Sequence, residues 1–261
     1  YQDARIIQIT PASTAVKFTE RGNWNTFRTC GRDDQQGAVA GEYLAKHFQG
    51  KKVAFVHDKT PYGKGLADET LKALKAKGGT NVLYEGINPG EKDFSALVSK
   101  LKQANVDVVY FGGLYTEAGL LIRQMRDQSL QAPLMGGDGI ADREFAQVAG
   151  PGSDGTLMTF SPDPRKNPVA EPVVKEIEAE GKSAEGYALY TYAAIQAWAD
   201  AVKAAGSTDY EPVVEALDSG DFSTVIGDLK FDDKGDVTLP GYVVYEWKNG
   251  KYDYVETASA Q

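Results

Sequence analysis

The chain has 261 residues, of which 42% are hydrophobic and 25% charged, the composition of a globular protein with one large domain or two ordinary ones. Its net charge of −9 excludes the basic surface of a nucleic-acid-binding protein. No apolar run approaches the roughly 18–20 residues that span a bilayer. A single cysteine, Cys30, excludes an internal disulfide framework, and two widely separated histidines argue against a zinc site.

Strand-like and helix-like segments alternate along the chain, which predicts an α/β fold with a parallel sheet covered by helices. The predicted strands are Ile6–Thr10, Lys52–His57, Asn81–Glu85, Asp107–Phe111, Pro133–Met135, Gly155–Phe160, Gly241–Trp247 and Tyr252–Val255. The predicted helices are Gln35–Phe48, Gly65–Lys77, Asp93–Ala104, Glu117–Gln128, Arg143–Val148, Pro172–Glu180, Tyr187–Ala205 and Glu211–Leu217. Four prolines between Ser161 and Pro172 predict a crossing loop, and Asn249–Gly250 predicts a hairpin turn.

Polar loops follow several predicted strands, at the edge where parallel sheets bind ligands. The first, Thr10–Thr14, places hydroxyl groups before a short helical turn. Such oxygens and free N–H groups suit a carboxylate, and an ordinary helix cap is the alternative. Asp138 lies between two glycines after a later strand, where it suits an ammonium group or bonds its own backbone in a turn.

The sequence contains no recognisable catalytic or nucleotide-binding motif. The loop Asp58–Gly65 presents Tyr62 at its rim but matches neither GxGxxG nor GxxxxGK[ST], and GxSxG, HExxH and CxxC are absent. The adjacent Asp33 and Asp34 could be catalytic carboxylates, but capping of the helix at Gln35 is the favoured interpretation. The sequence therefore predicts a protein with no catalytic residue, metal ion or cofactor.

Short motifs over essentially the whole chain occur in the same order as in a known family. They are Ile7–Thr14, His57–Lys59, Tyr62–Gly63, Gly90–Phe94, Val109–Gly113, Gly137–Gly139, Ala149–Gly150, Thr191–Ala194 and Phe231–Asp236. The chain thereby resembles the leucine/isoleucine/valine-binding proteins of ABC importers. The resemblance implies a periplasmic protein of the periplasmic-binding-protein type I fold, with two Rossmann-like lobes joined by three crossings. Residues 1–32 with 161–240 would form the first lobe, and 33–160 with 241–261 the second.

The resemblance also implies a binding site for a small amino acid. Ala12 and Thr14 would hold its α-carboxylate and amine, mostly through backbone and hydroxyl groups. Tyr62 would close over it from the second lobe, Asp138 would take the ammonium, and Tyr187 would line the side-chain pocket. The expected ligand-binding residues are Ala12, Ser13, Thr14, Tyr62, Leu114, Tyr115, Asp138 and Tyr187.

Two of these positions depart from the family pattern. Asp138 stands where branched-chain binders usually carry Glu, and Leu114 stands where they usually carry Tyr, with Tyr115 beside it. Asp is shorter by one methylene, so its carboxylate retreats by roughly 1.3–1.5 Å on a fixed backbone. This room favours alanine, proline or an ω-amino acid such as γ-aminobutyrate over leucine, and a branched-chain amino acid stays among the expected ligands.

The family's N-terminal stretch, with a serine-rich loop and a disulfide, has no counterpart in this sequence. We therefore expect a fragment, a cleaved chain held to its partner piece, or a missing start, with an unpaired sheet edge. The expected partners are an amino acid, an ABC-transporter permease and the missing N-terminal fragment, with hinge closure as the mechanism. An amino-acid-sensing module, such as a receptor ectodomain or biosensor fragment, is the alternative with the same fold. A Rossmann-like enzyme is a third interpretation, which turnover in the presence of nucleotide would support.

Overall fold

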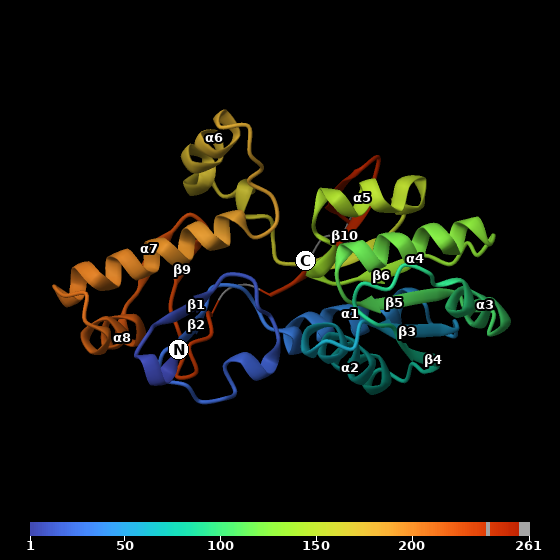
Figure 1. Ribbon diagram of the computed structural model, residues 1–261, viewed down its shortest axis with the longest axis horizontal. Helices are drawn as coiled ribbons and strands as arrows, with labels where there is room; N and C mark the ends of the chain where they lie inside the picture. Colours follow the sequence, from blue (N-terminus) through green and yellow to red (C-terminus); the bar gives the residue numbers. More distant parts are fainter. Residues whose placement is uncertain (239–240, 256–261) are drawn as a thin grey trace. The chain divides into compact units, whose positions relative to one another are not determined.

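The structure is a computed structural model that describes residues 1–238 and 241–255 (Figure 1). The chain divides into two compact units and passes from one to the other three times. Unit 1 comprises Tyr1–Arg32 and Ser161–Gly241, and unit 2 comprises Asp33–Phe160 and Tyr242–Gln261.

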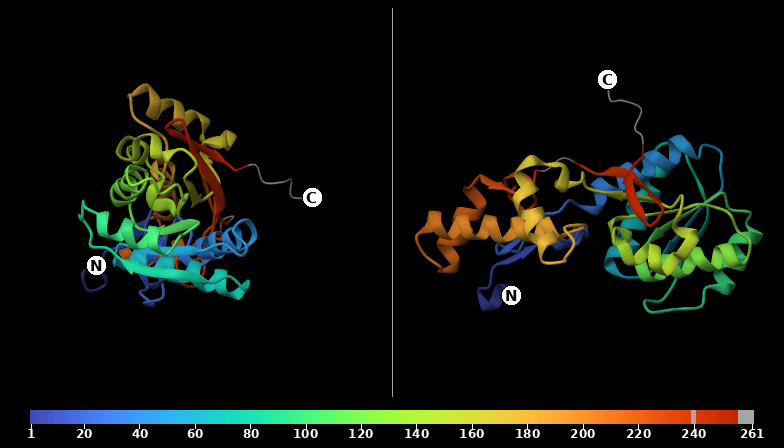
Figure 2. Two further views of the ribbon diagram at one scale, coloured as in Figure 1. Left: turned by 90° about the vertical axis from the view of Figure 1, so that its right-hand side faces the viewer. Right: turned by 90° about the horizontal axis from the view of Figure 1, so that it is seen from above.

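Unit 2 is built on a seven-stranded sheet. Its strands are β3 (Val53–His57), β4 (Asn81–Gly86), β5 (Val108–Gly112), β6 (Leu134–Gly136), β7 (Leu157–Phe160), β10 (Val243–Lys248) and β11 (Lys251–Tyr254). The order is β11-β10-β7-β6-β5-β3-β4, with β3 to β7 parallel. Strands β10 and β11 form an antiparallel hairpin at one edge of the sheet, drawn in red in Figure 2. Every residue of β3 and β5 is buried, as expected for parallel strands covered by helices on both faces.

The helices of unit 2 cover both faces of this sheet (Figure 1). They are α1 (Asp33–His47), α2 (Pro61–Ala76), α3 (Ser95–Gln103), α4 (Tyr115–Asp127) and α5 (Arg143–Ala149). From β3 the chain runs to β4 at the edge of the sheet, and it then runs in the opposite direction along the sheet through β5, β6 and β7. Because crossovers between parallel strands are right-handed, this reversal places α2 on one face and α3, α4 and α5 on the other. Helix α1 packs on α2, and a Cβ on Gly41 would lie only 2.5 Å from the Cβ of Ala73, so this close approach requires glycine.

Unit 1 contains a short parallel pair of strands and three helices longer than a single turn among its described residues. Its main elements are β1 (Gln8–Thr10), β2 (Thr26–Arg28), α6 (Glu171–Ala179), α7 (Ala188–Ala205), α8 (Tyr210–Ser219), β8 (Phe222–Thr224) and β9 (Gly227–Leu229). Its core gathers Phe27 from β2, Leu189 from α7 and Leu217 from α8. In the register of β1 and β2, Thr10 lies level with Arg28, so both strands end at the same edge.

The prediction of alternating strands and helices is confirmed, but several boundaries differ. Helix α2 begins at Pro61, a full turn before the predicted Gly65, because Thr60 caps it: the Gly63 N–H donates to Thr60 Oγ1 at 3.0 Å. Strand β2 was not predicted. The hairpin turn at Asn249–Gly250 is confirmed, with φ values of 53° and 73° at these residues.

Two further expectations are corrected. Asp33 and Asp34 lie within the first turn of α1, which begins at Asp33, rather than capping a helix that begins at Gln35. The predicted crossing loop after Ser161 contains two 3₁₀ turns, Pro164–Lys166 and Pro168–Ala170, because Asp163 and Asn167 cap them with their side chains.

Candidate functional site

The loop that follows β1 in unit 1 is held in a fixed shape by its own strand. Thr10 Oγ1 accepts the backbone N–H groups of Ala12 at 3.3 Å and Ser13 at 3.0 Å. Ala12 and Ser13 are exposed, whereas Thr14 is only 1% exposed and its Oγ1 has no hydrogen-bond partner within the described part of the chain. A buried hydroxyl without a partner is costly, so Thr14 offers a bonding position to a ligand or water.

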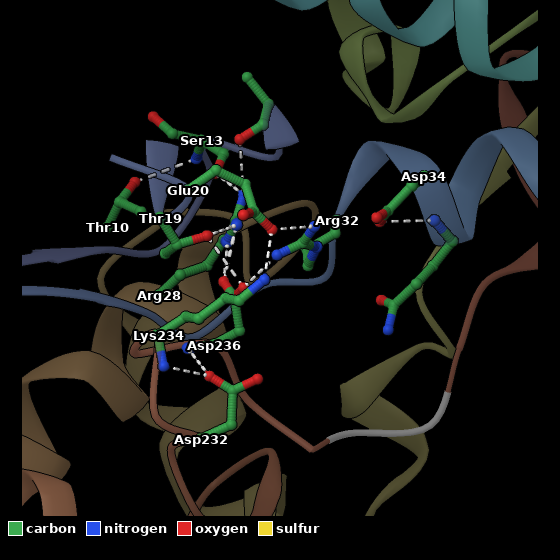
Figure 3. A network of polar contacts seen from close by, with 12 residues as sticks. Thr10, Ser13, Thr19, Glu20, Arg28, Arg32, Asp34, Asp232, Lys234 and Asp236 are labelled. Carbon is green, nitrogen blue, oxygen red and sulfur yellow. Dashed lines mark hydrogen bonds and ion pairs between the residues drawn. The ribbon is translucent and has the colours of Figure 1, made fainter. Parts of the chain in front are cut away.

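A buried ion-pair network lies behind this loop (Figure 3). Arg28, at the end of β2, is fully buried and pairs with Asp236, its Nε lying 2.8 Å and its Nη2 2.6 Å from Oδ1. Arg32 donates to the other oxygen of Asp236 at 2.6 Å and pairs with Glu20 at 3.0 Å. Lys234 also pairs with Glu20, at 2.7 Å. The sequence reading did not single out these charges, since arginine is seldom fully buried.

The start of α7 lies at the same edge of unit 1 as the loop. Thr29 donates its backbone N–H to the carbonyl of Thr10 at 3.0 Å and its hydroxyl to the carbonyl of Tyr190 at 3.2 Å. Tyr187 immediately precedes α7, is half-buried, and packs edge-on against Tyr190 with ring centroids 5.5 Å apart. The predicted residues Ala12, Ser13, Thr14 and Tyr187 thus belong to one end of unit 1.

In unit 2, the structure brings Tyr62 and Asp138 together. Tyr62 lies in the first turn of α2, and Asp138 follows β6 in a short 3₁₀ turn. The Tyr62 hydroxyl donates to Asp138 Oδ1 at 2.9 Å and accepts the Gly139 N–H at 2.9 Å. Burial raises the pKa of Tyr62 well above its usual value, and the carboxylates of Asp138 and Asp33 raise it further. Tyr62 therefore remains a protonated donor, and Asp138, 7% exposed, is held as its acceptor.

Glycines allow three strand-end loops of unit 2 to pack backbone on backbone around this pair. A Cβ on Gly139 would lie 2.4 Å from the carbonyl oxygen of Gly113 and 2.7 Å from the Tyr62 hydroxyl. A Cβ on Gly112 would lie 2.0 Å from the carbonyl oxygen of Gly63. Since real Cβ atoms do not approach so closely, the loops after β3, β5 and β6 meet only because glycine is present.

Leu114 and Tyr115 follow β5 directly, next to these loops. Leu114 precedes α4 and is 50% exposed. The carboxylate of Glu144 in α5 raises the pKa of Tyr115. The strongest influence on the Tyr115 hydroxyl therefore comes from α5.

Asp33 is the neighbour of this site that sequence reasoning missed. Its side chain is 1% exposed, and its charge acts on the Tyr62 hydroxyl. The sequence alone indicates a helix cap or a catalytic pair for Asp33 and Asp34, and neither interpretation places Asp33 beside Tyr62.

Metal and membrane sites are not evident in the described ranges, 1–238 and 241–255. No three His, Cys, Asp or Glu side chains of these residues are grouped to hold a metal ion. None of their helices is long and apolar enough to cross a membrane.

Comparison with known proteins adds independent information. The family model described as "Periplasmic binding protein" matches residues 1–251. A Leu/Ile/Val-binding protein homolog 1 of Brucella melitensis is 56% identical over 98% of this chain and 70% of its own length. An amino acid binding protein of Pseudomonas aeruginosa is 50% identical over 97% of this chain and 68% of its own.

Solved structures agree with these relatives. A leucine binding protein from Thermotoga maritima superposes with a TM-score of 0.88 at 29% identity, covering 97% of this chain and 73% of its own. A branched-chain amino acid transporter substrate-binding protein from Streptococcus pneumoniae, in complex with isoleucine, gives a TM-score of 0.85 at 26% identity, covering 96% of this chain and 72% of its own.

Proposed function

Because the chain belongs to the periplasmic binding protein family, we propose that it binds a free amino acid. Its fold is the type I periplasmic-binding fold, and the family consists of solute-binding proteins rather than enzymes. The observation that carries the proposal is the buried Asp138 carboxylate, held by the Tyr62 hydroxyl at the carboxyl ends of parallel strands.

Asp138 supplies the group that receives the ligand's ammonium. The hydroxyl that donates to one oxygen fixes the orientation of this carboxylate, and a charge-assisted hydrogen bond to an ammonium is roughly twice as strong as a neutral one. Tyr62 lies against this carboxylate and bounds the ligand on that side. Leu114 and Tyr115 are assigned to the rim of the site.

The loop after β1 supplies the groups for the carboxylate. Thr14 offers its backbone N–H and its unpartnered Oγ1. The Ala12 N–H is already donated to Thr10, so we assign Ala12 the role of accepting the ammonium through its carbonyl. Ser13 is exposed beside these groups, and Tyr187 lines the pocket for the ligand's side chain.

The ligand we favour is alanine, proline or γ-aminobutyrate. The relatives named above include a Leu/Ile/Val-binding protein homolog, so leucine, isoleucine and valine are the competing ligands. The Asp138 side chain is one methylene shorter than a glutamate at the same position. It therefore leaves room for a ligand whose amine lies further from the ligand's own carboxylate. In the periplasm, the protein closes on its ligand by hinge motion and delivers it to the permease of an ABC importer.

Isothermal titration tests this function. L-alanine, L-proline, γ-aminobutyrate, L-leucine, L-isoleucine and L-valine are titrated into the protein, and binding of at least one is expected. Asp138→Asn should abolish or greatly weaken that binding. Asp93→Asn should leave it unchanged, because Asp93 is an exposed carboxylate of the same unit that accepts hydrogen bonds from Ser95. Absence of binding to every amino acid would refute the function. Tighter binding of L-leucine than of the first three would refute the ligand class.

A further inference from the structure

Each nitrogen of the Arg28 guanidinium has a hydrogen-bond partner within unit 1 (Figure 3). Its Nη1 donates to the carbonyl oxygens of Ser13 and Ala15, each at 3.0 Å. Its Nη2 donates to Thr19 Oγ1 at 2.6 Å, and Asp236 takes its remaining bonds. A fully buried guanidinium with this many partners has one orientation, so the loop atoms bonded to it have one orientation too.

The direction of these bonds determines where the loop's N–H groups point. In a planar trans peptide the C=O and N–H bonds point in opposite directions. Because the Ser13 carbonyl points at Arg28, the N–H of Thr14 in the same peptide points away from it. The Ala15 carbonyl fixes the N–H of Val16 in the same way. The charge of Arg28 also polarises both peptides, which strengthens these N–H groups as donors.

Asp236 keeps the guanidinium in place from the other side. Its Oδ2 accepts Thr19 Oγ1 at 2.9 Å and Arg32 at 2.6 Å, while Oδ1 takes Arg28. The turn that carries Asp236 is pinned to β2, since a Cβ on Gly235 would lie 2.1 Å from the carbonyl oxygen of Thr26. Arg32 is the last residue of unit 1 before the chain enters unit 2, so one carboxylate holds both the binding loop's anchor and the end of this segment.

We propose that Arg28, held by Asp236, is the positioning residue of the carboxylate subsite: it fixes the Ser13–Thr14 peptide so that the Thr14 N–H and hydroxyl face the ligand's carboxylate. This inference rests on the proposed function for the identity of the ligand group. A purely structural ion pair would stabilise the fold without favouring a carboxylate. Buried ion pairs contribute little net stability compared with apolar residues. Fixing the geometry of the loop is therefore a better explanation of the Arg28–Asp236 pair than stabilising the fold.

The variant Arg28→Lys tests the proposal, because lysine keeps the charge beside Asp236 but cannot reproduce the guanidinium's fork of donors. The matched control is Arg126→Lys in unit 2, where Arg126 Nη1 likewise donates to two carbonyl oxygens, those of Leu130 and Ala132. Titrations use L-alanine, γ-aminobutyrate and L-leucine, each paired with its carboxamide. Arg28→Lys should reduce the preference for carboxylate over carboxamide by at least about tenfold, and Arg126→Lys should leave it unchanged.

Amide hydrogen exchange without any amino acid gives a second readout. The Ala12 and Ser13 amides should exchange faster in Arg28→Lys than in the wild type, and at wild-type rates in Arg126→Lys. Unchanged loop exchange, or a lowered melting temperature with unchanged carboxylate preference, would overturn the proposal. If the wild type binds no amino acid, the proposed function fails, and the exchange measurement still decides whether Arg28 holds the loop.

Discussion

The hydroxyl of Tyr62 donates to Oδ1 of Asp138 over 2.9 Å while accepting the N–H that follows Asp138 in the chain. A helix that begins after β3 is thereby joined to a turn that follows β6. The side chain proposed to receive the ligand's amine is therefore oriented by a residue distant in the sequence, and removal of one oxygen atom should loosen it.

Tyr62→Phe should weaken amino-acid binding by roughly tenfold, since a hydrogen bond to a charged group contributes about 1.5–3 kcal/mol. Tyr84→Phe is the matched control, because Tyr84 also bonds a carboxylate, that of Asp68, on the exposed side of unit 2. Titration calorimetry compares the two variants. Equal affinity in Tyr62→Phe and the wild type would show that the hydroxyl does not orient Asp138 for binding.

Gly139→Ala should destabilise the protein by about 1–3 kcal/mol, the usual cost of overpacking, and impair binding. The added Cβ would meet the Gly113 carbonyl oxygen at 2.4 Å. Gly65→Ala within α2 is the contrasting control. Among the described residues, no atom outside the neighbouring helix backbone lies within 4 Å of its added Cβ, and alanine should stabilise the helix by about 1 kcal/mol. Urea unfolding of both variants measures the difference, and a neutral Gly139→Ala would contradict the close packing.

Asp138→Glu should shift ligand preference toward leucine. The longer side chain restores the reach that a branched-chain ligand requires, and it crowds an ω-amine. The ratio of the dissociation constants for L-leucine and γ-aminobutyrate should fall by about tenfold or more, within the range that one methylene can contribute. A ratio that does not move would show that this side chain does not set ligand length.

His57 should make the protein less stable in mild acid. Burial lowers the pKa of His57, and its Nδ1 accepts the N–H of Lys59 at 3.0 Å, which requires an unprotonated nitrogen. A histidine with a lowered folded pKa contributes full stability above its unfolded value of about 6.5 and loses it as the pH falls below that value. Melting temperatures at pH 7.5 and 5 should differ less in His57→Gln than in the wild type. If the melting temperature falls by the same amount in both proteins, His57 does not cause the loss of stability in acid.

The sequence predicted where the candidate site residues lie relative to the strands better than it predicted which residues they contact. Hydrophobic runs ending in polar loops correctly placed Tyr62 and Asp138 after buried parallel strands, because strand direction alone determines that edge. Strand β2 escaped prediction because Thr26, Phe27 and Arg28 are too few to show a period, and pairing with β1 makes them a strand. Arg28 was missed because its burial depends on Asp236, which lies far along the chain.

Asp33 illustrates the same limit. Its local signal, an acidic residue at a helix start, correctly indicates the first turn of α1. Its effect on Tyr62 arises only from the packing of α1 against α2, which no local pattern encodes. Tertiary proximity decides which polar residues form the candidate site.

The antiparallel pairing of Phe160 with Val243 has a consequence for biosynthesis. Strand β7 leaves the ribosome before the whole second segment of unit 1, and its outer neighbour β10 emerges only afterwards. Until then β7 presents an open edge of the kind that invites wrong pairing. Because β10 and β11 are both synthesised last, this sheet is completed only after the second segment of unit 1 has left the ribosome and can begin to compact.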